Sequence, residues 1–274
     1  MGQRVPSLFV SHGLPTTALI EDEYSEALKN FGRNLNDLRA IVVVSSHWLT
    51  PGAIQVSANP KPFPQHHFYG YQQELYQLDY RPPASQVISE EIAALLDEKN
   101  FEVTLNAEAG LDHGVWMPLL RIRPEADVPV IQISLPMFVQ SRMVMNMGSA
   151  LASLREKGIL LIGSGGAASN PSKIMWSAGT LNVNQKIAEF DRWLRQQFME
   201  AQVEDILHYQ ELAPHAEFAH PTPANILPLM FIMGTALEGD SPGLIYQGFR
   251  YHSQSMLTLA LSQDQVAIKI QLTH

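Results

Sequence analysis

The stretch AIVVVSSHW at residues 40–48 decides the fold class. Its first five residues are apolar and rich in β-branched side chains, and small and polar residues follow them. An apolar run without alternation suits a strand that is buried on both faces, as in a parallel or mixed sheet covered by helices. The stretch therefore predicts an interior strand over residues 40–44.

Three further runs of this kind occur along the chain. Residues 7–10 precede Ser11-His12-Gly13, residues 159–162 precede a glycine-rich segment at 163–166, and residues 128–134 follow a proline-containing turn. Four other segments place apolar residues three and four positions apart, which is typical of amphipathic helices. These helices are expected at residues 23–30, 85–99, 141–157 and 184–202, with Ser85 as the N-cap of the second. Alternating strands and helices predict an α/β fold.

The chain is expected to form one domain over residues 1–274, with a central parallel or mixed sheet covered by helices on both faces, because no flexible or charged linker interrupts the pattern. Hydrophobic residues make up 46% and charged residues 16%, as in ordinary globular proteins. The start of the chain lacks the pattern of a secretory signal, and no apolar run approaches the roughly 20 residues that span a bilayer. We therefore expect a cytoplasmic protein without membrane contacts; its oligomeric state stays open.

Charge and cysteine content exclude several kinds of site. The net charge of −9, without any cluster of Lys and Arg, argues against binding to nucleic acid. The chain has no cysteine, which excludes disulfides, thiolate metal sites and cysteine nucleophiles. The segment at 163–166 lacks the ending of a phosphate-binding loop and the spacing of the dinucleotide fingerprint. Any metal ion must be held by nitrogen or oxygen.

Two histidines, His12 and His47, each follow a predicted buried strand. In open α/β sheets ligands bind at the carboxyl ends of the strands, and imidazole suits Fe, Zn, Cu or Ni. Either histidine alone could equally cap a strand end through a backbone hydrogen bond. The same placement found twice, each time beside small residues, favours a shared metal site.

Three more histidines have functional and structural interpretations that the residues alone leave open. His113 could donate a hydrogen bond to a bound oxygen anion or transfer a proton, and the neighbouring Asp112 could orient another group. His66 and His67 stand in a loop beside Phe68, where they could face a substrate or simply pack against aromatic rings.

Four motifs in a fixed order resemble those of the 4,5-DOPA extradiol dioxygenases of the class III ring-cleaving superfamily. They are SHGLP at 11–15, VVVSSHW at 42–48, LDHGVW at 111–116 and AHPTP at 219–223, and the resemblance covers nearly the whole chain. It implies a non-haem Fe(II) site, sometimes occupied by Zn(II). That site would chelate a catechol such as DOPA together with O₂ and cleave the ring beside its two hydroxyls.

The resemblance also implies roles for individual residues. His12 and His47 match two metal ligands, His113 matches a catalytic histidine lining the active site, and His66 matches a loop histidine near the pocket. We also expect His220, from the last motif, to contact the substrate.

Two departures from the family pattern fall at positions of chemistry. Ser169 stands where the family has its acid/base histidine, and Ala224-Asn225 stands where it has an acidic residue and the third histidine ligand. Asn225 could offer its amide oxygen, a poorer ligand than imidazole. His220 cannot simply replace that ligand, because it would point roughly 140° away on a helix and prolines restrict the backbone between them. Two hypotheses remain: a dioxygenase with a modified site, or a catalytically silent relative that binds a small molecule or a protein partner.

Overall fold

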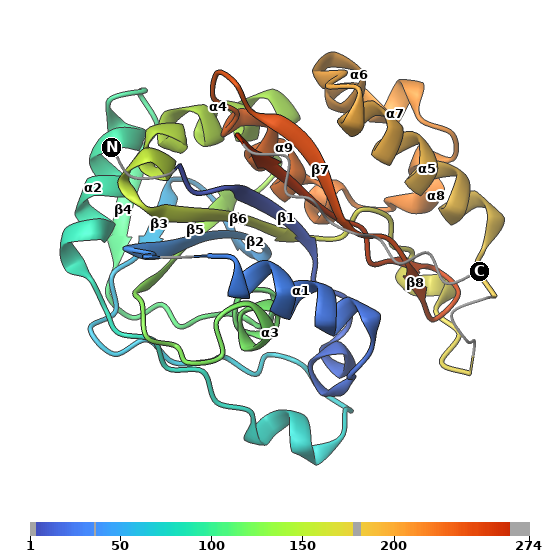
Figure 1. Ribbon diagram of the computed structural model, residues 1–274, viewed down its shortest axis with the longest axis horizontal. Helices are drawn as coiled ribbons and strands as arrows, with labels where there is room; N and C mark the ends of the chain where they lie inside the picture. The colour runs from blue at the N-terminus through green and yellow to red at the C-terminus, as the bar shows by residue number, and fades with distance from the viewer. Residues whose placement is uncertain (1–3, 36, 178–181, 264–274) are drawn as a thin grey trace.

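The computed structural model describes residues 4–35, 37–177 and 182–263. Eight strands form one mixed sheet in the order β4-β3-β5-β2-β6-β1-β10-β7 (Figure 1). Their bounds are β1 Ser7–Ser11, β2 Ala40–Thr50, β3 Ile54–Ser57, β4 Val103–Asn106, β5 Val130–Pro136, β6 Ile159–Gly165, β7 Ser241–Tyr246 and β10 Thr258–Ser262. β8 (Phe249–Arg250) and β9 (Gln254–Ser255) form a separate two-stranded ribbon.

The four strands at the centre of the sheet, β5, β2, β6 and β1, run parallel to one another. They are the four strands that the apolar runs predict, and the mixed sheet is confirmed by the antiparallel pairing of β10 with β1 and of β3 with β5. Because parallel strands end on the same side, the loops that follow β1, β2, β5 and β6 meet along one edge of the sheet.

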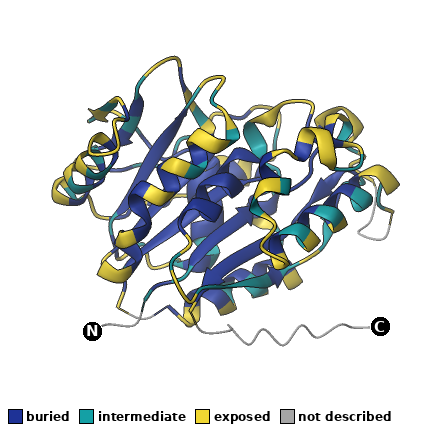
Figure 2. Cartoon of the chain, turned by 90° about the horizontal axis from the view of Figure 1, so that it is seen from above, coloured by how far each residue is buried: buried dark blue, intermediate teal, exposed yellow. Residues whose placement is uncertain are grey.

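Helices cover both faces of the sheet, as the sequence predicts. α1 (Glu23–Arg33) and α3 (His113–Ile122) pack on one face, and α2 (Gln86–Asp97), α4 (Ser141–Leu151), α5 (Gln185–Met199) and α9 (Leu227–Gly234) pack on the other. Along β2, Ile41 and Val43 face the first group of helices while Val42 and Val44 face the second. Figure 2 shows the result, with buried strands between helices whose outer sides are exposed. Burial on both faces is why these strands lack polar alternation.

The predicted helices are present, with one correction. Asp22, Ser85 and Asn184 accept backbone hydrogen bonds as the N-caps of α1, α2 and α5. The helix expected over 141–157 is α-helical only to Leu151 and continues as the 3₁₀ segment η3 (Ala152–Lys157). Tightening of this kind is common in the last turns of helices.

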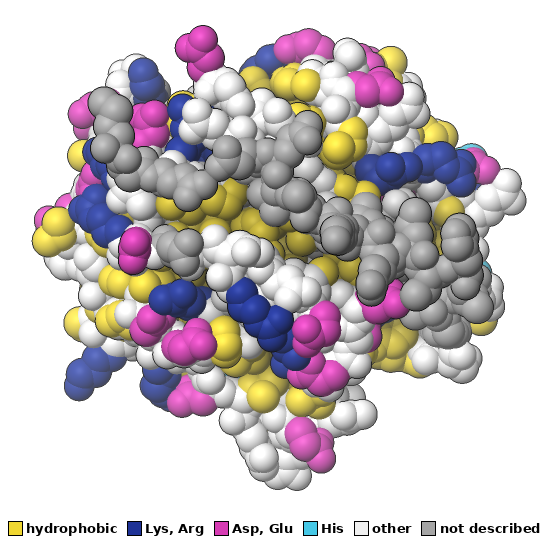
Figure 3. Space-filling model, in the orientation of Figure 1, with side chains coloured by type: hydrophobic (Ala, Val, Ile, Leu, Met, Phe, Trp, Pro, Cys, Tyr) yellow, Lys and Arg dark blue, Asp and Glu magenta, His cyan; other side chains and the backbone are white. Residues whose placement is uncertain are grey.

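Short helical segments complete the chain. They are η1 (Pro15–Leu19), η2 (Gln73–Gln77), η4 (Pro171–Lys173), α6 (Val203–Leu207), α7 (Tyr209–Leu212), α8 (Ala216–Ala219) and η5 (Pro223–Asn225). Among the described residues, none of the helices is both long and apolar enough to cross a membrane. On the face drawn in Figure 3, basic side chains are interspersed with acidic ones.

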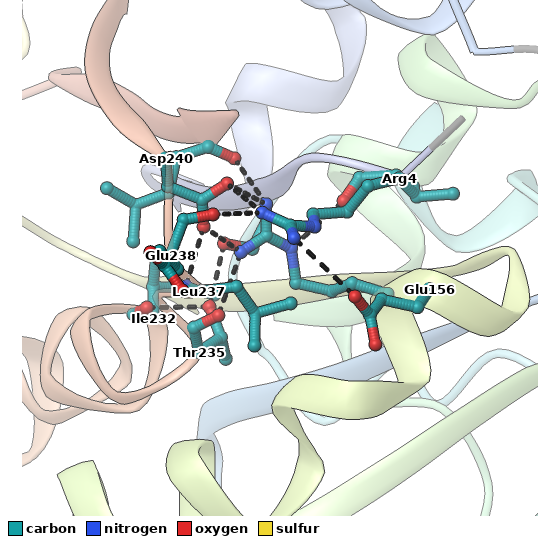
Figure 4. Close-up of polar contacts among 11 residues, drawn as sticks. Arg4, Glu156, Ile232, Thr235, Leu237, Glu238 and Asp240 are labelled. Carbon is teal, nitrogen blue, oxygen red and sulfur yellow. Dashed lines mark hydrogen bonds and ion pairs between the residues drawn. The ribbon is translucent and has the colours of Figure 1, made fainter. Parts of the chain in front are cut away.

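A buried ion pair joins η3 to the loop before β7. Arg155 is fully buried, and its five N–H groups donate to the carbonyls of Val5, Thr235 and Leu261 and to both carboxylate oxygens of Asp240. Arg4 lies beside this pair and donates to the Glu238 carbonyl at 2.9 Å (Figure 4). Burial, the largest single influence, raises the pKa of Asp240, but the hydrogen bonds from Arg155 and the Leu237 N–H, together with the charges of Arg155 and Arg4, outweigh it and lower that pKa below its usual value.

Replacing Asp240→Asn should lower the free energy of unfolding by about 3–5 kcal/mol, because the buried Arg155 would keep its charge and lose its counter-ion. Urea unfolding at pH 7, followed by circular dichroism, measures the change. Glu238→Gln is the control: its exposed side chain should contribute less than about 0.5 kcal/mol. A loss below about 1 kcal/mol for Asp240→Asn would contradict this view of the pair.

Candidate metal centre

The position of His12 follows from the pairing of β1 with β6. Val10 lies opposite Ser164, and the backbone N–H of His12 continues the pairing by donating to the Gly165 carbonyl at 3.0 Å. Gly13 then has a φ of +74°, and a Cβ there would lie 2.5 Å from the Thr17 hydroxyl. Glycine therefore lets the chain turn away sharply, which leaves the His12 side chain at the carboxyl edge of the sheet.

His47 lies within β2 and not after it, which corrects the predicted end of that strand. β2 continues to Thr50, but its pairing with β5 shifts register between Val44 and Leu49. Such irregularities re-aim side chains and are frequent beside functional sites. The Ser45 hydroxyl accepts the backbone N–H of His47 at 3.2 Å, which holds the irregular segment. The His47 side chain is accessible to solvent through a cavity, although surrounding protein atoms still bury it enough to lower its pKa.

The structure brings the two imidazoles together, as the strand placement predicts. The Nε2 atoms of His12 and His47 lie 2.9 Å apart. Ser164 donates its hydroxyl proton to the Gly114 carbonyl, so its oxygen accepts from Nδ1–H of His12 at 3.0 Å. Nε2 of His12 therefore carries a lone pair directed at His47. Two metal–nitrogen bonds of about 2.05 Å that meet at about 90° separate their nitrogens by about 2.9 Å, so the pair fits one metal ion.

His113, the first residue of α3, lies beside this pair. Its ring centroid is 4.0 Å from that of His47, and the possible ligand nitrogens of the three rings lie within 4.8 Å of one another. Two nitrogens bonded to one ion can be about 4.2 Å apart at most. For His113 to become a third ligand beside His12 and His47, its ring would therefore have to shift slightly. Burial, helped by His47, lowers the pKa of His113 to about 3, so the ring is neutral at pH 7. Within the described chain, its buried Nδ1 has no hydrogen-bond partner.

A cavity of about 250 Å³ opens beside the three histidines. Ser169 and Asn225, the two positions that depart from the family pattern, both line it. Asn225 reaches the cavity because Gly165 lets its segment approach β6: a Cβ on Gly165 would lie 2.1 Å from the Asn225 carbonyl oxygen. The same carbonyl accepts from Gly166 N–H at 2.8 Å. Both positions where the resemblance implies a histidine therefore belong to the same cavity.

His66 does not line the cavity, contrary to the prediction. Its Nε2 lies 2.9 Å from the Leu78 carbonyl oxygen, and its ring packs on Trp116. Phe68 contacts the rings of both His66 and His113, with centroids 5.8 and 5.6 Å away, and itself lines the cavity. His66 therefore packs behind Phe68, which lines the cavity, and is not itself part of the lining.

His220, expected to contact the substrate, is not among the lining residues of the cavity either. His220 follows α8, and its buried ring donates from Nε2 to the Ala167 carbonyl at 2.8 Å while packing on Phe190 and Tyr209. Burial lowers its pKa to about 4. The backbone changes direction in the Pro-rich turn between His220 and Asn225. Asn225 therefore lies at the cavity, whereas His220 lies in the core.

Asp112 has the orienting role that the sequence indicates for it, whereas the place of Gln254 in the site was not predicted. Asp112 accepts hydrogen bonds from Ser45, at 2.9 Å, and from Gln132, so it orients the segment that carries His47. Burial raises the pKa of Asp112, and His47 opposes that effect. Gln254, only 5% exposed, lines the cavity, and its Oε1 has no hydrogen-bond partner among the described residues. A lone glutamine in a two-residue strand gives no sequence signal of this kind.

Comparisons with known proteins agree with these findings. Residues 5–259 match a family model described as the catalytic LigB subunit of aromatic ring-opening dioxygenase. A protein named 4,5-DOPA dioxygenase extradiol from Escherichia coli K12 is 33% identical over 94% of this chain and 95% of its own length. A protein of the same name from Portulaca grandiflora is 37% identical over 88% of this chain and 90% of its own. The crystal structure of an uncharacterized E. coli K12 protein aligns with a TM-score of 0.79 and 28% identity, over 94% of this chain and 99% of that one.

Replacing Ser164→Ala should weaken Zn(II) binding about 10–100-fold, because the tautomer and orientation of His12 would lose their hydrogen-bond partner. Competition with a chromophoric chelator measures the affinity. Ser46→Ala is a matched control, since the Ser46 hydroxyl is buried and has no hydrogen-bond partner in the described residues. Equal losses in the two variants would contradict the role of Ser164.

Acid should destabilise the protein partly through His220. The pKa of His220, about 4, is below the value of about 6.5 in the unfolded chain. The contribution of the neutral ring to the free energy of unfolding is therefore complete above pH 6.5 and is lost as the pH falls toward 4. His220→Gln cannot titrate, so its loss of unfolding free energy between pH 7 and pH 5 should be smaller than that of the unmodified protein by roughly 1–2 kcal/mol. Urea unfolding at the two pH values tests this, and equal losses would refute it.

Proposed function

This chain belongs to the family of catalytic LigB subunits of aromatic ring-opening dioxygenases, and on that premise we propose that its cavity binds a catechol for extradiol ring cleavage by O₂. The observation that carries the proposal is the pair of Nε2 atoms of His12 and His47, 2.9 Å apart beside the cavity. The name 4,5-DOPA dioxygenase extradiol, borne by several similar proteins, supports a catechol as the substrate class.

His12 and His47 would hold a divalent metal, Fe(II) or Zn(II) in its place. Fe(II), when bound, would supply the joint chelation of the catechol and O₂. Asn225 is the proposed third ligand through its amide oxygen, and His113 is a second candidate because its ring lies within a small shift of the pair. An amide is a weak ligand for a divalent transition metal, so we expect a low metal affinity.

The surrounding side chains would prepare the site for proton transfer. His113, neutral near pH 7, offers an unprotonated ring nitrogen that can accept a catechol proton. A base with a pKa of about 3 is far from the working pH, which makes that transfer inefficient. Ser169 can hydrogen-bond to a substrate, but the pKa of a serine hydroxyl is too high for it to act as the base near neutrality. The proposed reaction is therefore slow.

A second candidate function is that of a catalytically silent relative that binds a small molecule in the same cavity. It is favoured by Ser169 and Asn225, which line the cavity where the family resemblance implies histidines. Metal analysis of protein purified without added metal, together with oxygen uptake on a panel of catechols, separates the two functions.

Restoring Ser169→His together with Asn225→His should give tight, stoichiometric iron and oxygen uptake with DOPA that is about 10²–10⁴-fold faster, the usual contribution of general acid–base catalysis. The unmodified protein should bind metal weakly and cleave slowly or not at all. Either restoration alone should be insufficient, because the ligand and the base act in different steps.

The matched control is the double variant Ser172→His and Thr222→His, which adds two histidines at exposed positions outside the cavity. It should change neither property. Tight stoichiometric iron and rapid oxygen uptake in the unmodified protein would mean that other residues fill both roles, and the proposal of a weakened site would be wrong.

A further inference from the structure

The cavity beside the three histidines is lined by neutral side chains. Among the described residues, its lining contains no Asp, Glu, Lys or Arg. We infer that the catechol for which this site is built carries an uncharged, apolar substituent, and not the ammonium and carboxylate of an amino acid. The inference rests on the proposed function, because it specifies the substrate of the same site.

The polar atoms that the cavity offers suit hydroxyl groups. Gln254 is almost fully buried, and its Oε1 has no hydrogen-bond partner among the described residues, so this oxygen is an unused acceptor. The Ser169 hydroxyl adds a neutral group that can donate or accept. A neutral amide and a neutral hydroxyl can satisfy the hydroxyls of a catechol, but neither can neutralise a buried carboxylate or ammonium.

Three charged groups in neighbouring segments are engaged elsewhere or exposed. Asp112 is buried and accepts from Ser45 and Gln132. Arg250 is paired with Asp22, at 2.5 Å, on the side of α1. Lys173 precedes the cavity residue Ile174, but it is exposed and lines a separate surface hollow with Lys186 and Glu189. Lys173 is therefore a cation that an experiment has to test as a partner for a carboxylate.

The outer part of the cavity is apolar and aromatic. Leu14, Tyr71 and Ile174 are partly exposed apolar or aromatic residues of its lining, and Trp176 extends this surface by packing on Tyr71, with ring centroids 6.2 Å apart. A substituent leaving the catechol ring must cross this surface to reach solvent. Each methylene buried there improves affinity about fourfold, whereas an unpaired charge loses part of its hydration.

The test uses four catechols that share the ring and differ in the charge of the substituent: 4-ethylcatechol, dopamine, 3-(3,4-dihydroxyphenyl)propionate and DOPA. Dissociation constants are measured by titration calorimetry on the full chain saturated with Zn(II), which has no redox chemistry of its own. The neutral 4-ethylcatechol should bind at least tenfold more tightly than each of the other three. Equal or tighter binding of any charged catechol overturns the inference but leaves the proposed function standing. If none of the four binds, the proposed catechol site itself is wrong, and the inference fails with it.

Matched variants at the mouth of the cavity give an independent check. Ile174→Lys supplies the missing cation, so the anionic propionate should gain several-fold in affinity while 4-ethylcatechol does not. Ile174→Met, of similar length without the charge, should leave the order of affinities unchanged. Lys173→Ala should not alter binding of the propionate or DOPA. A loss of several-fold for both acids in Lys173→Ala would show that this lysine already serves as the carboxylate partner, which overturns the inference.

Discussion

The site depends on the position of β6 between β1 and β2. Ser164 of β6 lies opposite Val10 on one side and Ser45 on the other, so a single register fixes where both neighbouring strands end. His12 and His47 are 35 residues apart in sequence, yet their Nε2 atoms are 2.9 Å apart. The Ser164 hydroxyl links the same strands to α3 through the Gly114 carbonyl and fixes the tautomer of His12. A slip of β6 by one residue would reverse its faces and separate these groups.

Burial decides the electrostatics of the site. It lowers the pKa values of His12, His47 and His113 and raises that of Asp112, so each of these groups is biased toward its neutral form. Neutral imidazoles have the lone pairs that a metal needs. The same environment makes His113 a poor base near pH 7. Burial thus favours metal binding by these histidines and disfavours proton transfer by His113.

The fold does not depend on the side chains at positions 169 and 225, because other contacts stabilise it. The parallel strands are buried between two layers of helices. The Arg155–Asp240 pair joins η3 to the loop before β7, and neither residue lines the cavity. The backbone of η5 is kept against β6 by close contact at Gly165, whatever side chain follows at position 225. A family fold can therefore persist while the chemistry of its site changes.

The sequence by itself determined the α/β class, the four inner strands, the four helices α1, α2, α4 and α5, and the edge at which His12 and His47 meet. It could do so because strands buried on both faces leave a continuous apolar pattern and their ends bind ligands. Only the tertiary structure decided that His47 lies in an irregular part of β2, that His66 backs an aromatic wall, and that His220 is buried in the core. It also decided that Ser164 and Gln254 belong to the site. The direction of a side chain beyond a strand end depends on register and packing against distant segments, which local patterns do not encode.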